Sequence, residues 1–277
     1  MLPNFLIIGA AKAGTTSLYQ YVRGHPQAFM PDRKELSFFC AEFNWSRGLD
    51  WYQSHFEGAG PALAIGEASP RYTVHPLYQG VPARIAAVMP DVRLVYLVRD
   101  PIMRMQSQYL DNVIHGLEKH PVEEALTDNL FYLTSSRYAL QLEQYLEHFP
   151  RNQILVLRSE DLRSERELTL SRVFDFLQID PSWRSALFEM EFLSTTGRRV
   201  PRRLFHKVWY SRVTRRVAPL LPRSFKDRFR VATSTMVHPE SATLSPPFRR
   251  HLEDLLREDV RRLYGFMDER FDGWGIA

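Results

Sequence analysis

The sequence contains one cysteine, Cys40, among its 277 residues. A lone thiol cannot form an intramolecular disulfide, so the sequence excludes a disulfide-stabilised domain and favours a reducing compartment. We interpret Cys40 as a buried apolar side chain rather than a catalytic thiol. Long apolar runs are also missing, because no stretch reaches the ~18 residues that a membrane-spanning helix needs. These two absences lead us to expect a cytoplasmic protein.

The chain has no proline-, glycine- or serine-rich linker, no low-complexity tract and no internal repeat. Its 44% hydrophobic and 25% charged residues are ordinary for a globular protein. A chain of this length can bury one large core, and nothing in the composition marks a boundary between two cores. We therefore predict a single domain over residues 1–277.

Acidic residues are almost missing between Arg198 and Arg230, where twelve Lys and Arg stand against Asp227 alone. Such a block indicates an anionic partner, or else a solvated basic face. Apolar residues recur with helical spacing from about 203 to 222, which predicts a basic amphipathic helix. Three interpretations stay open: a lid or packed surface helix, a contact for an anionic glycan, and a peripheral contact with an anionic membrane.

Short apolar runs alternate with helical patterns along the chain. The runs at 4–8, 62–65, 92–98 and 153–157 are typical of buried parallel strands. Helical spacing covers 15–22, 49–56, 82–89, 137–149, 165–177 and 247–266. This alternation predicts an α/β fold with a central parallel sheet flanked by helices. Ligands of such folds bind beyond the carboxyl ends of the strands, which selects the segments after residues 8, 65 and 98.

The segment after residue 8 resembles a phosphate-binding loop with a displaced lysine. The Walker pattern G-x-x-x-x-G-K-[ST] fits at Gly9, Gly14 and Thr16. Thr15 occupies the lysine position, and Lys12 lies inside the loop instead. Backbone amides that open a helix point at a bound anion, and the helix dipole assists them. The predicted anion-binding group comprises Ala13, Gly14, Thr15, Thr16 and Ser17.

The two other segments carry charged candidates. Glu67 comes just after the run at 62–65, which makes it a candidate general base or, alternatively, a capping or ion-pairing acid. After residue 98, Asp100 is expected to cap a helix whose first residue is Pro101. Ser107 then lies two turns into that helix, so Arg99 and Ser107 can converge on one anion. A magnesium-binding role for Asp100 conflicts with its use as a cap.

The displaced lysine indicates the kind of anion. A nucleotide kinase needs its lysine on the β- and γ-phosphates and a hydroxyl on Mg²⁺. Here the lysine comes earlier, no clear magnesium-binding acid remains, and no histidine pair has the spacing of a metal site. A donor with a single phosphate at the transferred end suits this loop, with Lys12 offsetting charge on the bridging oxygen. The alternative is a P-loop kinase or NTPase that uses ATP and Mg²⁺.

Taken together, these residues resemble sulfotransferases that use 3′-phosphoadenosine-5′-phosphosulfate (PAPS). "FLIIGAAKAGTTSLYQYVRGHP" is similar to their 5′-phosphosulfate loop, and "YLVRDPIMRMQSQY", with Arg99 and Ser107 eight residues apart, to their 3′-phosphate motif. Similar segments recur at 34–39, 48–56, 137–162 and 263–274, so the resemblance covers nearly the whole chain. It implies PAPS as donor, 3′,5′-ADP as product, no metal requirement, and transfer to a hydroxyl or an amine.

Within that family, the motifs are most similar to bacterial and heparan-sulfate-type carbohydrate sulfotransferases. The segment "GEASP" resembles the one that carries their base, which implies catalytic roles for Glu67 and Lys12. A glycan or glycolipid acceptor follows from the resemblance, while Ser37 and Ala68 depart from the common pattern in regions that contact the acceptor in relatives. The expected acceptor-binding residues are Lys34, Glu35, Trp51 and Arg71.

The basic block aligns with a loop from which relatives reach the 3′-phosphate. The resemblance leaves open which side chain of this block does so; the candidates are Arg198, Arg199 and Arg202. It further implies carbohydrate sulfation by a bacterial cytoplasmic enzyme with no nucleic-acid partner. A peripheral contact at the inner face of the membrane remains one interpretation of the basic helix.

Overall fold

The computed structural model describes residues 1–192, 199–201, 234–236, 239–267 and 270–277. These residues divide into two compact units. The first comprises Met1–Met105, Asn129–Leu193 and Ser245–Ala277, and the second comprises Gln106–Asp128 and Ser194–Leu244. The single domain stays a prediction, and the amphipathic segment 203–222 lies outside the described residues.

A parallel sheet forms the centre of the first unit, as the alternating pattern predicts. Its described strands lie in the order β2-β3-β1-β4-β5. Their bounds are β1 Phe5–Gly9, β2 Ala28–Phe29, β3 Ala64–Ala68, β4 Arg93–Val98 and β5 Ile154–Arg158. Strand β1 pairs with β3 on one side and with β4 on the other, and the chain crosses from one side to the other after β3, so β1 is the switch point of the sheet. The carboxyl ends of these three strands therefore meet at one edge, where open α/β sheets bind ligands.

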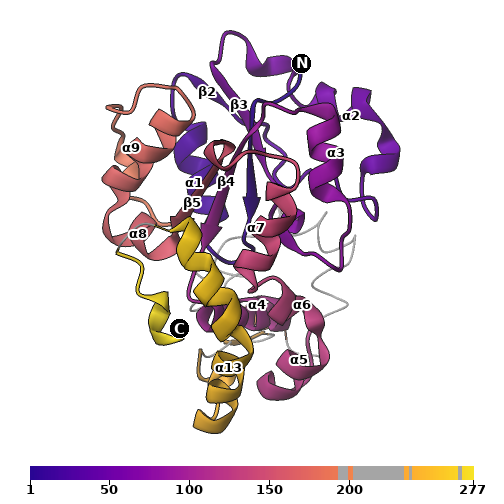
Figure 1. The fold of residues 1–277 in the computed structure, drawn as a ribbon, viewed down its shortest axis with the longest axis vertical. Coiled ribbons are helices and arrows are strands. Elements are labelled where there is room, and N and C mark those ends of the chain that lie inside the picture. The colour runs from indigo at the N-terminus through magenta and orange to yellow at the C-terminus, as the bar shows by residue number, and fades with distance from the viewer. Residues whose placement is uncertain (193–198, 202–233, 237–238, 268–269) are drawn as a thin grey trace, which may run out of the picture. The chain divides into compact units, whose positions relative to one another are not determined.

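Helices cover both faces of this sheet (Figure 1). Helices α1, α8 and α9 lie on one side of it, and α3 and α7 on the other. The bounds within the first unit are α1 Thr15–Arg23, α2 Leu49–Ser54, α3 Val81–Val88, α6 Leu130–Thr134, α7 Tyr138–Leu146, α8 Ser159–Ser164, α9 Arg166–Phe176 and α13 Pro246–Leu263. Helix α4 (Pro101–Ile114) begins in the first unit and continues into the second, which also holds α5 (Val122–Asp128) and the antiparallel pair β6 (Arg199–Pro201) and β7 (Ser234–Met236). No helix among the described residues is long and apolar enough to cross a membrane.

Helices α13 and α7 are joined by a buried carboxylate. Asp259 of α13 is 3% exposed and accepts hydrogen bonds from the amides of Ala139 (3.0 Å) and Leu140 (2.9 Å) at the start of α7. The first amides of a helix have no acceptor within the helix, so a carboxylate there satisfies them. The contact joins residues 119 and 120 positions apart in the sequence.

The position of Glu67 differs from the expectation. The sequence pattern ends the strand at residue 65, but β3 continues to Ala68 and includes Glu67. Gly66 permits this continuation, because a side chain there would lie 2.3 Å from the Phe5 ring on the neighbouring β1. Glu67 is consequently a strand residue opposite Leu6 rather than a residue of the following loop.

Candidate active site

The loop between β1 and α1 is fixed by hydrogen bonds from two arginines that follow β4 in the sequence. The guanidinium of Arg99 donates to the carbonyl of Lys12 (3.2 Å), and that of buried Arg104 donates to Ala11 (3.3 Å). Lys12 has a φ of 69° and Gly14 a φ of 95°, both in the left-handed region. A non-glycine residue at positive φ persists where its surroundings fix it, and such residues cluster at functional sites. The loop is therefore a fixed turn.

The amino end of α1 is the candidate anion site. Gly14 is the N-cap residue of the helix, and as a glycine it has no side chain that could cap the first amides. The Nζ of Lys34 lies 2.5 Å from the hydroxyl oxygen of Thr16 in the first turn. Burial lowers the pKa of Lys34, the neighbouring Glu35 carboxylate opposes this shift, and the positive charge of Lys12 adds to it. The amides at this helix end, with the Lys34 ammonium beside them and Lys12 in the preceding loop, fit a phosphate-like anion.

Other residues of the predicted anion-binding group are engaged locally. The Ala13 amide donates to the carbonyl of Ala10 (3.1 Å), and the hydroxyl of Ser17 donates to Phe192 (3.2 Å). Thr15 is buried. Their part in anion binding stays a prediction.

Arg99 lies at the end of β4 beside a second cation that the sequence did not single out. Burial lowers the pKa of Arg99, and the next cause is the positive charge of Arg163 on α8. Ser107 is buried on α4 in the second unit, so its convergence with Arg99 stays a prediction. Arg198 and Arg202 lie outside the described residues, and Arg199 stands in β6.

Glu67 is the centre of a buried hydrogen-bond network. The side chain is 1% exposed. Its Oε2 accepts from the hydroxyl of Ser69 (2.6 Å), and its Oε1 accepts from Tyr72 (2.5 Å) and Tyr52 (3.4 Å). Burial raises the pKa of Glu67 to about 7, although the hydrogen bonds oppose the shift. Both oxygens thus face protein hydroxyls.

This raised pKa predicts how stability depends on pH. Between its ordinary pKa of 4.5 and the folded value of about 7, Glu67 keeps a proton in the folded state that the unfolded chain has lost. Stability contributed by this group therefore falls as pH rises through that window. We expect wild type to lose up to roughly 3 kcal/mol more than Glu67→Gln between about pH 5 and pH 8. Urea unfolding of both proteins at the two pH values measures this difference, and equal losses would contradict it.

Glu35 lies in a different environment from Glu67. It has a φ of 60°, and its side chain is 42% exposed. Its carboxylate lies 3.6 Å from the Nζ of Lys34 and 3.4 Å from the guanidinium of Arg71. Three of the four expected acceptor-binding residues thus come together, around a carboxylate that solvent reaches. Lys34 also contacts Thr16, so this group adjoins the anion site.

Trp51, the fourth, belongs to a surface where aromatic rings and arginines alternate. The guanidinium carbon of Arg47 lies 4.3 Å from the centre of the Trp51 ring, and that of Arg33 lies 5.7 Å from it. Arg71 lies 4.9 Å from the ring of Phe43, which is 40% exposed. Such cation–π pairs leave the guanidinium edges available for an anion. The two arginines on Trp51, Arg33 and Arg47, were not predicted, since no local motif marks them.

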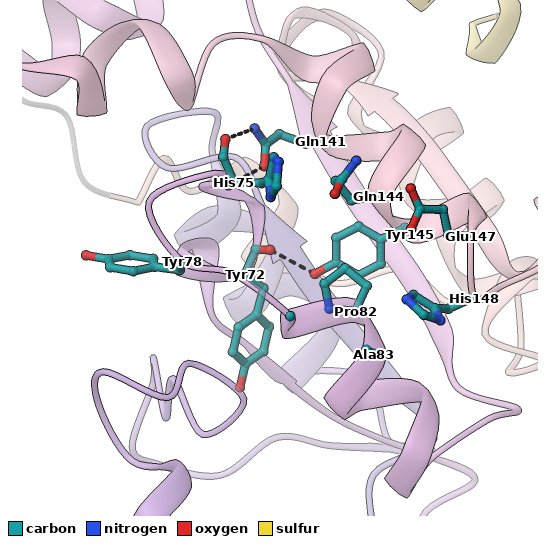
Figure 2. A pocket seen from close by; sticks show the side chains of 11 residues that line it. Tyr72, His75, Tyr78, Pro82, Ala83, Gln141, Gln144, Tyr145, Glu147 and His148 are labelled. Atoms are coloured by element: carbon teal, nitrogen blue, oxygen red, sulfur yellow. Dashed lines mark hydrogen bonds between the residues drawn. The ribbon is translucent and has the colours of Figure 1, made fainter.

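A pocket beyond Tyr72 is separate from the anion site (Figure 2). It lies between the segment after β3 and helix α7, where Tyr145 donates to the carbonyl of Tyr72 (2.9 Å). Its lining residues are Tyr72, His75, Tyr78, Gly80, Pro82, Ala83, Gln141, Gln144, Tyr145, Glu147 and His148. This lining contains no lysine or arginine, so it does not fit a phosphate.

Two further predictions concern Asp100 and Cys40, and both are confirmed. One carboxylate oxygen of Asp100 accepts from the amides of Ile102 (2.9 Å) and Met103 (3.0 Å), so Asp100 caps α4. Cys40 is fully buried, and burial raises the pKa of its thiol to about 12. Among the described residues, no group of three or more His, Cys, Asp or Glu could hold a metal ion.

Known proteins share extended sequence similarity with this chain. A family model described as a sulfotransferase domain matches residues 2–194. Human heparan sulfate glucosamine 3-O-sulfotransferase 5 is 30% identical over 209 residues, which cover 71% of this chain and 58% of that protein. The membrane-associated sulfotransferase kil1 of Dictyostelium discoideum is 26% identical over 271 residues, covering 65% and 56%. The chain thus spans somewhat more than half the length of these relatives.

Solved structures share the fold. A sulfotransferase from Alicyclobacillus acidocaldarius superimposes with a TM-score of 0.73 at 23% identity, covering 99% of both chains. A mouse sulfotransferase complexed with PAP superimposes with a TM-score of 0.53 at 12% identity, covering 99% of this chain and 88% of that one. At these identities the likeness concerns the fold alone.

Proposed function

Because the chain belongs to the sulfotransferase domain family, we propose that it transfers a sulfuryl group from PAPS to a hydroxyl of a glycan or glycolipid. The observation that carries this proposal is the anion site, where the first turn of α1 meets Lys12 and Lys34. Its cations and helix amides suit the 5′-phosphosulfate of PAPS. A solved structure with this fold contains PAP, the desulfated form of that donor.

The transfer requires a base for the acceptor hydroxyl, a cation for the leaving oxygen and a site for the 5′-phosphate, all at one edge of the sheet. The acceptor oxygen attacks sulfur, the bond between sulfur and the bridging phosphate oxygen breaks, and the acceptor proton passes to a base. The products are a sulfate ester and 3′,5′-ADP. Lys12 would offset the charge that grows on the leaving oxygen, and the amides of residues 14–17 would hold the 5′-phosphate.

Two carboxylates compete for the role of base. The sequence-based assignment is Glu67, whose pKa of about 7 suits proton transfer at neutral pH. Its burial argues against this role, because a base must lie within hydrogen-bond reach of the acceptor hydroxyl. Glu35 is accessible and adjoins the anion site through Lys34. We therefore favour Glu35 as base, and the assignment of Glu67 stays a prediction that the variants below test.

The surface around Glu35 suggests the chemistry of the acceptor. Arg71 beside Glu35, with Arg47 and Arg33 on the half-buried Trp51, combines positive charge with an aromatic ring. A glycan that already carries negative charge would complement both features. Several relatives are named for heparan sulfate, which supports an acceptor of this class.

The donor can be tested before the acceptor is known. We expect 3′,5′-ADP to raise the melting temperature more than ATP with Mg²⁺ does, whereas a kinase would show the reverse. A mass-spectrometric screen with labelled PAPS and a panel of anionic and neutral glycans then tests transfer. Stabilisation by ATP with Mg²⁺ alone, with no labelled product, would reject the proposal.

Recognition of the 3′-phosphate provides a further prediction. We expect Arg99→Ala to weaken 3′,5′-ADP binding by roughly 1.5–3 kcal/mol, the range for a hydrogen bond to a charged group. Binding of 5′-AMP, which lacks the 3′-phosphate, should weaken far less. Calorimetric titration of both ligands measures the two losses. Equal losses would show that Arg99 acts only through the Lys12 carbonyl that it holds.

The expected location stays a prediction. The basic segment 203–222 lies outside the described residues, so its proposed contact with an anionic membrane rests on the sequence alone. The cytoplasmic and bacterial assignments have the same status.

A further inference from the structure

We propose that Glu67 is a positioning residue, which holds segment 34–38 in the shape that presents Lys34 and Glu35 at the active site. The inference rests on the proposed function for its catalytic consequence, but its structural part does not depend on it. It gives a role to the most buried carboxylate at this edge of the sheet, for which direct proton transfer is sterically unsuited.

Glu67 reaches the segment through three consecutive backbone amides. The amide of Leu36 donates to the Glu67 carboxylate itself. The amide of Ser37 donates to the hydroxyl of Ser69 (2.9 Å), which in turn donates to Glu67 (2.6 Å). The amide of Phe38 donates to the hydroxyl of Tyr72 (3.0 Å), which also donates to Glu67 (2.5 Å). One carboxylate therefore satisfies, directly or through one hydroxyl, the amides of residues 36 to 38.

These hydrogen bonds hold a backbone conformation that is unfavourable for residues with a side chain. Glu35 has a φ of 60° and Ser37 a φ of 47°, where residues with a side chain are uncommon. Such conformations persist only when the surrounding structure over-determines them. The Glu35 amide is also bound to the carbonyl of Ala68 (3.0 Å), next to Glu67 on β3. The segment is thus fixed to β3, with the Glu35 side chain exposed to solvent while Leu36 and Phe38 stay buried.

Within the described part of the chain, Glu67 is the one acidic or basic residue in this network of hydroxyls and amides. The groups that face the Glu67 carboxylate are the hydroxyls of Ser69, Tyr72 and Tyr52 and the Leu36 amide. A hydroxyl can donate to one partner and accept from another. The hydroxyls of Ser69 and Tyr72 therefore donate to Glu67 and at the same time accept from backbone amides. A buried amide left without an acceptor raises the free energy of the folded state. The loss of Glu67 should therefore destabilise the conformation of residues 36–38.

The test uses variants with graded chemistry. Glu67→Gln keeps a carbonyl acceptor of the same size but cannot take up a proton, whereas Glu67→Ala removes the acceptor entirely. Ser69→Ala breaks only the link to Ser37, and serves if Glu67→Ala fails to fold. Asp259→Asn is the matched control, because it alters a buried carboxylate that also binds backbone amides, but at the start of α7.

Two readouts separate positioning from proton transfer. Hydrogen exchange of the amides of residues 36–38 should accelerate at least tenfold in Glu67→Ala, accelerate at residue 37 in Ser69→Ala, and stay unchanged in Asp259→Asn. In single turnover, Glu67→Gln should stay within about tenfold of wild type and keep the acid limb of the rate–pH profile. Glu67→Ala should be slower than Glu67→Gln, so the conservative variant restores part of the rate.

Distinct results would overturn the proposal. Unchanged exchange at residues 36–38 in Glu67→Ala, or at residue 37 in Ser69→Ala, would show that the network does not hold the segment. Loss of the acid limb in Glu67→Gln, with Glu35→Gln still active, would make Glu67 the base. If wild type transfers no sulfuryl group to any acceptor, the proposed function fails, and the exchange measurements still decide whether Glu67 holds the segment.

Discussion

Replacing Glu35 by Gln is expected to lower the rate of sulfuryl transfer by about 10²–10⁴-fold, the usual contribution of a positioned general base. The change keeps the size of the side chain and its contact with Arg71, but removes the group that accepts the acceptor proton. Donor affinity should change little, because the contact between Glu35 and the candidate anion site runs through Lys34. Single-turnover transfer at saturating PAPS measures the chemical step without interference from product release.

Glu42→Gln is the control for this experiment. Glu42 is an exposed carboxylate a few residues along the same part of the chain, and it contacts neither Lys34 nor Arg71 in any ion pair described above. Its substitution should leave the rate within twofold of wild type. A Glu35→Gln variant with a near-normal rate would remove Glu35 as base and return the role to Glu67.

Replacing Lys12 by Ala should lower the same rate by about 10²–10³-fold, the range for losing one group that stabilises developing oxyanion charge. The charge on the bridging oxygen grows as its bond to sulfur breaks, so the loss should appear mainly in the chemical step. Some affinity for PAPS should also be lost, because the phosphosulfate is anionic before it reacts. Lys119→Ala, which removes an exposed lysine elsewhere, should have no effect.

The combination of Lys12→Ala with Glu35→Gln is informative in its own right. Both side chains act in one transition state, so their effects should combine to less than the product of the single losses. A fully multiplicative loss would indicate that the two act in separate steps. A Lys12→Ala variant that loses only donor affinity would assign the leaving-group role elsewhere, and Lys34 would be the next side chain to test.

The sequence predicted those parts of the site that local chemistry determines. The glycine spacing and the following helix located the anion loop, and Asp100 with Pro101 located the start of α4. Strand periodicity brought the three site segments to one edge of the sheet, as the structure confirms. The two-residue strand β2 was missed, because so short a strand leaves no periodic pattern.

Sequence patterns could not predict contacts between segments that are far apart in the sequence. Lys34 meets Thr16 only because segment 34–38 returns along β3, and nothing within "KELSFF" shows that return. The end of β3 was placed too early, since the close packing of Gly66 on Phe5 depends on the register between strands. The burial of Glu67 follows from that register, which is why the sequence alone presented it as an accessible base.

The buried contact between Asp259 and the start of α7 also bears on the order in which the chain acquires its structure during synthesis. The ribosome makes α7 more than a hundred residues before the carboxylate that satisfies its first amides. Until then α7 lacks that acceptor, and Tyr145 on α7 binds the carbonyl of Tyr72 beside the Glu67 network. The hydrogen bonds between Asp259 and the first amides of α7 can therefore form only after α13 has been translated.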